Sequence, residues 1–254
     1  MKARKLEQPA LEDGFAVLLR ELSLKEIAGL IERTARWVAP ETFKLLPVWF
    51  PEYWRGARLH NAAWTEARSN TNRLTGQTVP KLEGNGYANL ALCLALGIRK
   101  RDRPNWSCCH IWGRDDLTFQ VNNTVVADPR FYSCVANMVL LPTPLKAFTD
   151  SMPEIRMMLR ICATNLYGWR CDHDDLAANH EAIQAFTDWS AYPASWPRTR
   201  SGRRPPGLVP LNDVIRANAQ KRLGRIRSDL KNAGPKYPRV SVLETMRHWS
   251  VGLE

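Results

Sequence analysis

The sequence predicts an α+β protein that is mostly helical and carries a small strand–strand–helix module near its middle. Apolar residues recur at helical spacing in long segments, most clearly over 153–169 and 211–231. The short apolar runs 106–112 and 137–142 instead favour strands, because they are rich in Cys, Ile, Trp, Val and Leu and are bounded by prolines or turn residues. We expect three regions: a helical region 1–103, the module with its following helices 104–192, and a basic linker with a C-terminal helical arm 193–254.

The composition is that of an ordinary globular chain. Of the 254 residues, 44% are hydrophobic and 24% are charged. The first residues lack the apolar core of a signal peptide, and no stretch approaches the length of a membrane span. Six cysteines in such a chain predict reduced thiols rather than a disulfide framework. We therefore expect a cytoplasmic protein with no membrane partner.

The net charge of +11 is concentrated near the C-terminus. Residues 198–239 contain twelve Lys or Arg and only two acids. A segregated excess of this kind is typical of proteins that bind a phosphate backbone, although a solvated basic tail has the same composition. We expect DNA as the partner, and the sequence leaves open whether the protein is a monomer or a homodimer. The residues expected to contact nucleic acid are Arg198, Arg200, Arg203, Arg204, Lys221, Arg222 and Arg225.

Local signals place most of the other elements. Ser23 and Glu26 form a capping-box pattern at the start of a helix over 23–38. A compact apolar helix over 88–97 ends at Gly97. Segment 60–73 is expected to begin as a helix and then become polar, and 193–210, rich in Pro and Gly, is expected to be an extended linker. Further helices are expected over 175–189 and 241–249.

Two segments outside the module permit a structural and a functional interpretation. The aromatic stretch 47–58 is expected to pack in the core, but Arg55 and Arg58 lie within it and could contact phosphates. Asn70, Asn72 and Arg73 are residue types that read base edges and are equally common in loops.

The module contains the candidate catalytic residues. His110 ends the first strand-like run, Asn137 begins the second, and Asp150 lies on the short helix expected after Pro142 and Pro144. A neutral histidine can activate water, and a carboxylate suits a hard cation such as magnesium. The alternative for His110 is a structural histidine that donates to a backbone carbonyl.

This order of elements resembles the ββα-metal (HNH) nuclease family. The resemblance implies that His110 is the general base and that Asn137 orders the loop bearing the catalytic histidine. It also places metal ligands at Cys109 and Asp150 and a third catalytic position at Lys146, with Mg²⁺ or Mn²⁺ as the cofactor. The implied activity is metal-dependent hydrolysis of DNA, as in a restriction or phage-defence endonuclease.

The match departs from the family pattern at two of these positions. Cys109 stands where the family often has Asp or His, and Lys146 where it commonly has His or Asn. Asp115, Asp116 or Asp128 could supply an oxygen ligand in place of Cys109. Structural zinc is not expected, because the chain contains no CxxC pair. A DNA-binding protein that keeps the module as a scaffold remains an alternative, as does a nuclease or toxin directed at RNA.

Overall fold

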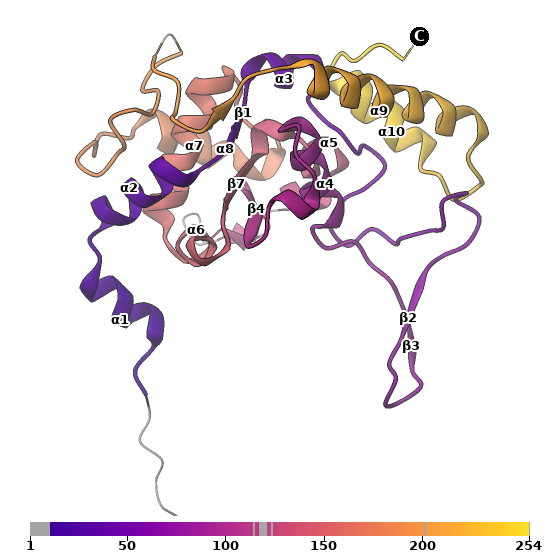
Figure 1. The fold of residues 1–254 in the computed structure, drawn as a ribbon, viewed down its shortest axis with the longest axis horizontal. Helices are drawn as coiled ribbons and strands as arrows, with labels where there is room; N and C mark the ends of the chain where they lie inside the picture. Colours follow the sequence, from indigo (N-terminus) through magenta and orange to yellow (C-terminus); the bar gives the residue numbers. More distant parts are fainter. Residues whose placement is uncertain (1–10, 114, 117–120, 123, 201, 254) are drawn as a thin grey trace, which may run out of the picture.

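The computed structural model describes residues 11–113, 115–116, 121–122, 124–200 and 202–253. It confirms the α+β class, with many helices arranged around short strands (Figure 1). The helices are α1 (Gly14–Glu21), α2 (Leu24–Thr34), α3 (Pro40–Leu45), α4 (Gly86–Ala95), α5 (Pro129–Tyr132), α6 (Lys146–Ser151), α7 (Pro153–Tyr167), α8 (Ala177–Gln184), α9 (Asp213–Asn232) and α10 (Arg239–His248). The strands are β1 (Trp37–Val38), β2 (Ser69–Thr71), β3 (Thr78–Pro80), β4 (Trp106–His110), β5 (Asp115–Asp116), β6 (Val121–Asn122), β7 (Met138–Pro142) and β8 (Leu208–Val209).

Each sheet in the described part of the chain has two strands. The longest pairing is antiparallel, between β4 and β7, and it sets His110 opposite Met138. β2 pairs with β3 and β5 with β6, also antiparallel, whereas β1 and β8 run parallel. Arg36 and Leu140 exchange two backbone hydrogen bonds of 2.9 and 3.1 Å, so β7 also has a neighbour on its second edge. No described helix combines the length and the apolar character that a membrane crossing requires.

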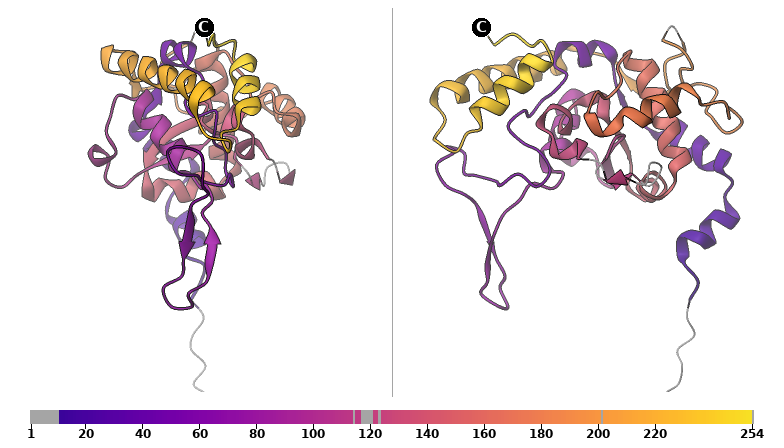
Figure 2. Two further views of the ribbon diagram at one scale, coloured as in Figure 1. Left: turned by 90° about the vertical axis from the view of Figure 1, so that its right-hand side faces the viewer. Right: turned by 180° about the vertical axis from the view of Figure 1, so that it is seen from behind.

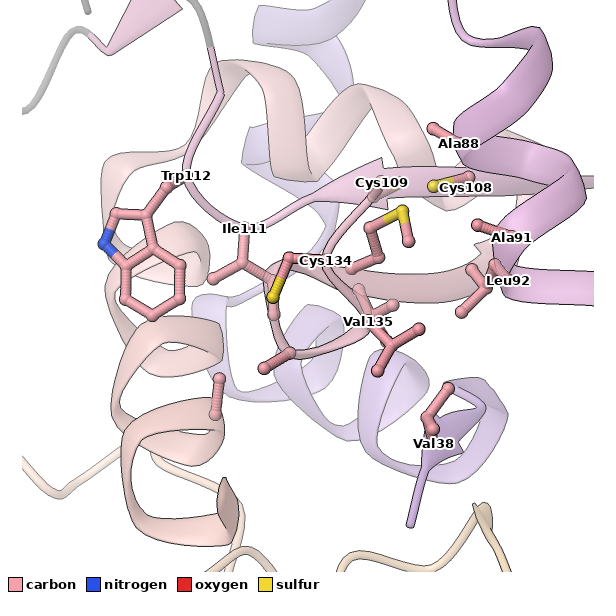
Figure 3. Packing of buried hydrophobic residues seen from close by; sticks show 14 of the residues in the cluster. Val38, Ala88, Ala91, Leu92, Cys108, Cys109, Ile111, Trp112, Cys134 and Val135 are labelled. Carbon is pink, nitrogen blue, oxygen red and sulfur yellow. The ribbon is translucent and has the colours of Figure 1, made fainter. Parts of the chain in front are cut away.

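The β4–β7 pair lies inside the hydrophobic core. Residues 138–141 of β7 are all buried, which explains why this strand is continuously apolar rather than alternating. Figure 3 shows α4 on one side of the pair, with Ala91 and Leu92 beside Cys108 of β4. The same core cluster includes residues from all three regions expected from the sequence, among them Ile31, Ile161 and Ile226.

Most helices form where the local signals predict them. The capping box at α2 is present, with Glu26 N–H donating to Ser23 Oγ and Ser23 N–H donating to Glu26 Oε2 at 2.8 Å. α2 ends at Thr34 rather than at residue 38, because Trp37 and Val38 pair with β8 instead. α7 ends at Gly168, whose φ of 63° is the left-handed conformation that favours glycine at this position.

The expected helix at the start of segment 60–73 does not form. His60 and Ala67 are joined by an isolated antiparallel bridge, and Ser69–Thr71 becomes β2. The side chains of Ser, Thr and Asn compete for backbone hydrogen bonds, and here Asn61 bonds to both the backbone and the side chain of Thr65. These local bonds hold a turn where helical spacing of the apolar residues suggested a helix.

The segment expected to be an extended linker is packed against the body. Trp196, Pro197 and Pro205 are buried, and the Trp196 ring meets that of Trp37 edge-on at 5.7 Å. At Gly207 any Cβ atom would lie 1.9 Å from the carbonyl oxygen of Ala35, so only glycine allows β8 to approach β1 this closely.

The C-terminal helices also belong to this body. α9 packs on α4, and Ile215, Ala219 and Ile226 form its buried face. Arg222, expected to contact nucleic acid, is buried on the same helix. Its guanidinium pairs with Glu52, donates to the carbonyl of Trp49 and lies 4.4 Å from the centroid of the Phe50 ring. The sequence could not show this, because Arg222 lies between exposed cations on a polar helix and its partners are about 170 residues away.

Replacing Arg222 by methionine should destabilise the fold strongly. The substitution leaves the Glu52 carboxylate buried without its partner, so we expect the free energy of unfolding to fall by about 3–5 kcal/mol in urea denaturation. Lys221→Met is the matched control, because Lys221 is exposed on the same turn and should change stability by about 0.5 kcal/mol or less. A small, equal effect of both substitutions would contradict a structural role for Arg222.

Candidate active site

The candidate site forms at the end of β4, where the chain turns away from the β4–β7 pair. His110 is the last residue of β4, and Asn137 directly precedes β7. α6 follows β7 and contacts β4, so Lys146 and Asp150 are brought back toward the same end of the strands. The order of strand, loop, strand and helix is the order expected from the sequence. Assignment of this module to the HNH family stays a prediction.

Asn137 holds the turn that follows His110. Its side chain is fully buried; Oδ1 accepts from Trp112 N–H at 2.8 Å, and Nδ2 donates to the carbonyls of Trp112 and Phe131, both at 3.2 Å. Its own carbonyl accepts from Ile111 N–H at 2.9 Å. Asparagine suits this position because one planar group supplies both an acceptor and two donors to buried backbone.

His110 is half-buried and held by the backbone of Tyr132. Its Nε2 lies 2.8 Å from the Tyr132 carbonyl, and the two rings stack with centroids 5.7 Å apart. A carbonyl only accepts, so Nε2 carries the proton in this bond and Nδ1 carries the lone pair. Burial lowers the pKa of His110 to about 4, so the imidazole is neutral at physiological pH.

Tyr132 is itself fixed to the segment that enters α4. Its hydroxyl lies 2.6 Å from Glu83 Oε1, to which it donates, and 3.0 Å from the carbonyl of Gly84. The buried Glu83 carboxylate also accepts from Tyr87 N–H at 3.0 Å. Burial and the hydrogen bond to Glu83 raise the pKa of Tyr132, so it remains a neutral donor. The position of the His110 ring therefore depends on a second, buried set of hydrogen bonds.

His110 lines a small polar cavity of about 240 Å³. Arg55 donates to Asn85 Oδ1 at 2.6 Å, and Lys146 forms an ion pair with Asp150 one helical turn later. Arg156 donates to the carbonyls at the end of α6, including that of Thr149 at 3.0 Å. Among the described lining residues, three cations face one carboxylate, which makes the cavity a suitable site for an anion. The cavity is lined by Arg55, Asn85, Cys108, Cys109, His110, Gly113, Lys146, Asp150 and Arg156.

The structure does not favour Cys109 as a metal ligand. Its side chain is 3% exposed, and its Sγ lies 3.7 Å from Thr149 Oγ1, which donates to it. Burial raises the pKa of the Cys109 thiol to about 11, whereas a metal binds the thiolate.

Asp150 is the only described carboxylate that lines the cavity, and Lys146 pairs with it. Asp128, another candidate ligand, pairs with Arg130 and lines a different cavity, and the side chains of Asp115 and Asp116 lie outside the described part. Within that part, no three His, Cys, Asp or Glu side chains gather closely enough to hold a metal ion. Magnesium is often bound by one or two carboxylates together with substrate phosphates, and Asp150 fits such a site only if it separates from Lys146.

Comparison of the chain with protein-family models, with curated proteins and with solved structures gave no match.

The exposed basic residues expected to bind nucleic acid lie on several surfaces of the protein. Arg198 stacks on the rings of Trp189 and Tyr192, and Arg203 donates to the carbonyl of Ala194 at 2.9 Å. Arg204 pairs with Glu41 at 3.0 Å and Arg225 with Asp229 at 2.8 Å, while Arg200 and Lys221 are exposed. Neither Lys221 nor Arg225 lines the cavity, and Figure 1 shows their helix, α9, away from α6.

Sequence reasoning missed two polar side chains of the cavity, those of Asn85 and Arg156. Asn85 looked like part of a turn, and Arg156 like a solvent-facing residue of α7. Arg55 was noted as a candidate phosphate contact, but its position beside His110 could not be foreseen, because the two residues come from unconnected segments. The Gly84–Gly86 turn before α4 was the one available signal, since such turns bring backbone close to a ligand.

The depressed pKa of His110 predicts a specific pH dependence. Between about pH 4 and 6.5 the unfolded chain binds a proton at this residue that the folded protein does not, so stability should rise with pH across this window. We expect the ring protons of His110 to titrate near pH 4 in NMR spectra. The resonance is assigned by its absence in His110→Ala. The stability of this variant should lack the part of the rise between about pH 4 and 6.5 that His110 contributes. A midpoint near 6.5 would contradict the burial of the ring.

Proposed function

We propose that this protein hydrolyses phosphodiester bonds in DNA, with the scissile phosphate bound in the cavity beside His110. One observation carries the proposal: a neutral histidine, fixed through one ring nitrogen, shares a cavity with Arg55, Lys146 and Arg156. A phosphate diester is a singly charged anion, and guanidinium and ammonium groups are its usual ligands in proteins. The resemblance of the module to HNH nucleases supports the same reaction.

In the proposed reaction, His110 acts as the general base. Nδ1 takes a proton from a water molecule as the water oxygen attacks phosphorus, and the bond from phosphorus to the leaving sugar oxygen breaks. The charge that develops on the phosphate oxygens is stabilised by Arg55 and Lys146. Nε2 keeps its proton and its bond to the Tyr132 carbonyl, which holds the ring in place while Nδ1 gains its proton. Solvent then protonates the leaving oxygen and removes the proton from His110.

A divalent metal remains part of the proposal through Asp150 alone. Mg²⁺ or Mn²⁺ would neutralise phosphate charge when bound, and Asp150 would hold it together with substrate oxygens. Lys146 has a role in either case, because its ammonium can pair with Asp150 or with the phosphate. Arg198, Arg200, Arg203, Arg204, Lys221 and Arg225 remain predicted contacts to the DNA backbone outside the cavity.

His110→Ala should separate catalysis from binding. The substitution removes the base and no cation, so cleavage of plasmid DNA should fall by about 10²–10⁴-fold while affinity in a gel-shift titration stays nearly constant. His180→Ala is the matched control, because His180 lies on α8 and does not line the cavity. If both variants bind DNA and neither they nor the parent cleave it, the protein is a DNA-binding protein that retains the module as a scaffold.

Lys146→Ala tests the cation in the cavity. Loss of one stabilising donor should lower the cleavage rate by about 10²–10³-fold. Lys44→Ala, on the surface helix α3, is the control and should match the parent. Assays with Mg²⁺, with Mn²⁺ and with chelator show whether Asp150 acts through a metal. Cleavage by Lys146→Ala at the parent's rate under every condition would exclude Lys146 from the reaction.

A further inference from the structure

The β2–β3 ribbon is the most exposed element of the fold. Every residue from 69 to 80 is exposed, and the two strands pair in register, with Asn70 opposite Val79 and Thr71 opposite Thr78. Figures 1 and 2 show it extending away from the body, past the side on which β4 and α6 lie. An isolated two-stranded hairpin is only marginally stable in water, and this one buries none of its own residues. Its contribution to the core therefore does not explain its presence.

One face of the ribbon carries amide and basic side chains. Because successive residues of a strand point to opposite faces, Asn70 shares its face with Arg68 on the same strand and with Val79, Gln77 and Lys81 on the other. The opposite face is formed by Ser69, Thr71, Thr78 and Pro80, and its two threonine hydroxyls lie 3.0 Å apart and bond to each other.

Asn70 and Gln77 are exposed, and no described residue forms a hydrogen bond with the side-chain amide of either one. Asn72 differs, because its Oδ1 accepts from Leu74 N–H at 2.9 Å and from Thr75 N–H at 3.3 Å. Asn72 therefore holds the turn of the ribbon, whereas the other two amides are available to a ligand.

All charged side chains of the ribbon are positive. Between residues 67 and 82 there are three basic residues and no acid. Arg68 and Lys81 lie at its base, where Lys81 N–H donates to the Arg68 carbonyl at 2.9 Å, and Arg73 lies near its tip. The element is thus complementary to a polyanion along its whole length.

The base of the ribbon is joined to the cavity by a short stretch of hydrogen-bonded chain. Leu59 N–H donates to the Lys81 carbonyl at 2.9 Å, and Gly56 N–H donates to the Glu83 carbonyl at 2.8 Å. Gly56 follows Arg55, and Glu83 is two residues before Asn85, so both paired segments continue directly into the cavity wall. Lys81 and Asn85 are four residues apart, a span of at most about 14 Å. A DNA duplex with its phosphate in the cavity would therefore reach the ribbon within a few base pairs.

We propose that the β2–β3 ribbon enters the major groove of the DNA, where Asn70 and Gln77 read base edges and Arg68 and Lys81 contact the flanking phosphates. The major groove admits a two-stranded ribbon, and Asn and Gln amides pair in bidentate fashion with adenine. The inference rests on the proposed function, since it assigns the element by which a DNA nuclease selects its site.

The test is selection of bound sequences from a pool of DNA duplexes with a randomised segment, in chelator so that cleavage does not interfere. The parent protein should enrich a base pattern. Asn70→Ala and Gln77→Ala should each bind bulk DNA within a few-fold of the parent but lose discrimination at one or two positions, by about 5- to 150-fold. Ser69→Ala, on the opposite face of the ribbon, is the matched control and should select the parental pattern.

The cations give a second, independent measurement. Arg68→Ala combined with Lys81→Ala should weaken binding to every sequence and reduce the salt slope of log K by about 1.8, the value for two phosphate contacts. Circular dichroism verifies that each variant is folded.

The outcomes distinguish this proposal from the proposed function. DNA bound and cleaved by the parent, with the same selected pattern in Asn70→Ala and Gln77→Ala, overturns the role of the ribbon and leaves the nuclease intact. No DNA binding by the parent overturns both. A dimer in sedimentation that the ribbon variants lose would assign the ribbon to a second copy of the chain and overturn its role on DNA.

Discussion

The geometry of the candidate site depends on the buried amide of Asn137. Its side-chain hydrogen bonds tie the turn after β4 to the segment before β7, two stretches that the strand pairing alone would leave free to diverge. Without them, the N–H and the carbonyl of Trp112 would lose these partners, at a cost of about 1–3 kcal/mol for each buried group left unpaired. His110 lies immediately before this turn, so the same bonds that stabilise the strand ends also fix where its ring lies. One residue therefore contributes both to stability and to the position of the candidate base.

A second constraint is the balance of charge around the cavity. Lys146 and Asp150 form an ion pair on α6, and the guanidinium group of Arg55 lines the same cavity as His110. The low pKa of His110 agrees with these surroundings, because burial and nearby cations both oppose its protonation. In the proposed reaction, the negative charge of a substrate phosphate would offset part of this positive charge and would thereby favour transfer of a proton to the ring.

The sequence predicted those features that short stretches of chain determine by themselves. Ser23 and Glu26 are three residues apart, and Gly97, with a φ of 67°, lies just after the end of α4, so each signal is complete within one turn. The apolar strands around His110 and Asn137 were also visible, and β7 is the clearer of the two because residues 138–141 are all buried. The thiols were expected to be reduced, and all six are free and buried.

Features that depend on distant segments could not be predicted in this way. Arg222 has the same neighbours in sequence as the exposed cations beside it, and only the approach of Glu52 makes it a core residue. Likewise, nothing near Arg55 or Asn85 indicates that both meet His110. The supposed linker was misjudged because proline and glycine allow an extended chain without showing whether that chain is packed.

The pairing of β1 with β8 has a consequence for how the protein reaches this structure. Trp37 and Leu208 are neighbours in a parallel ladder although 171 positions separate them in the chain. During synthesis on the ribosome, β1 cannot pair with β8 until most of the polypeptide has been made. Closing so large a loop is also slow. The central strands can pair well before that moment. Folding should accordingly begin with the central strands, and the pairing of β1 with β8, which joins the first and last quarters of the chain, should form last.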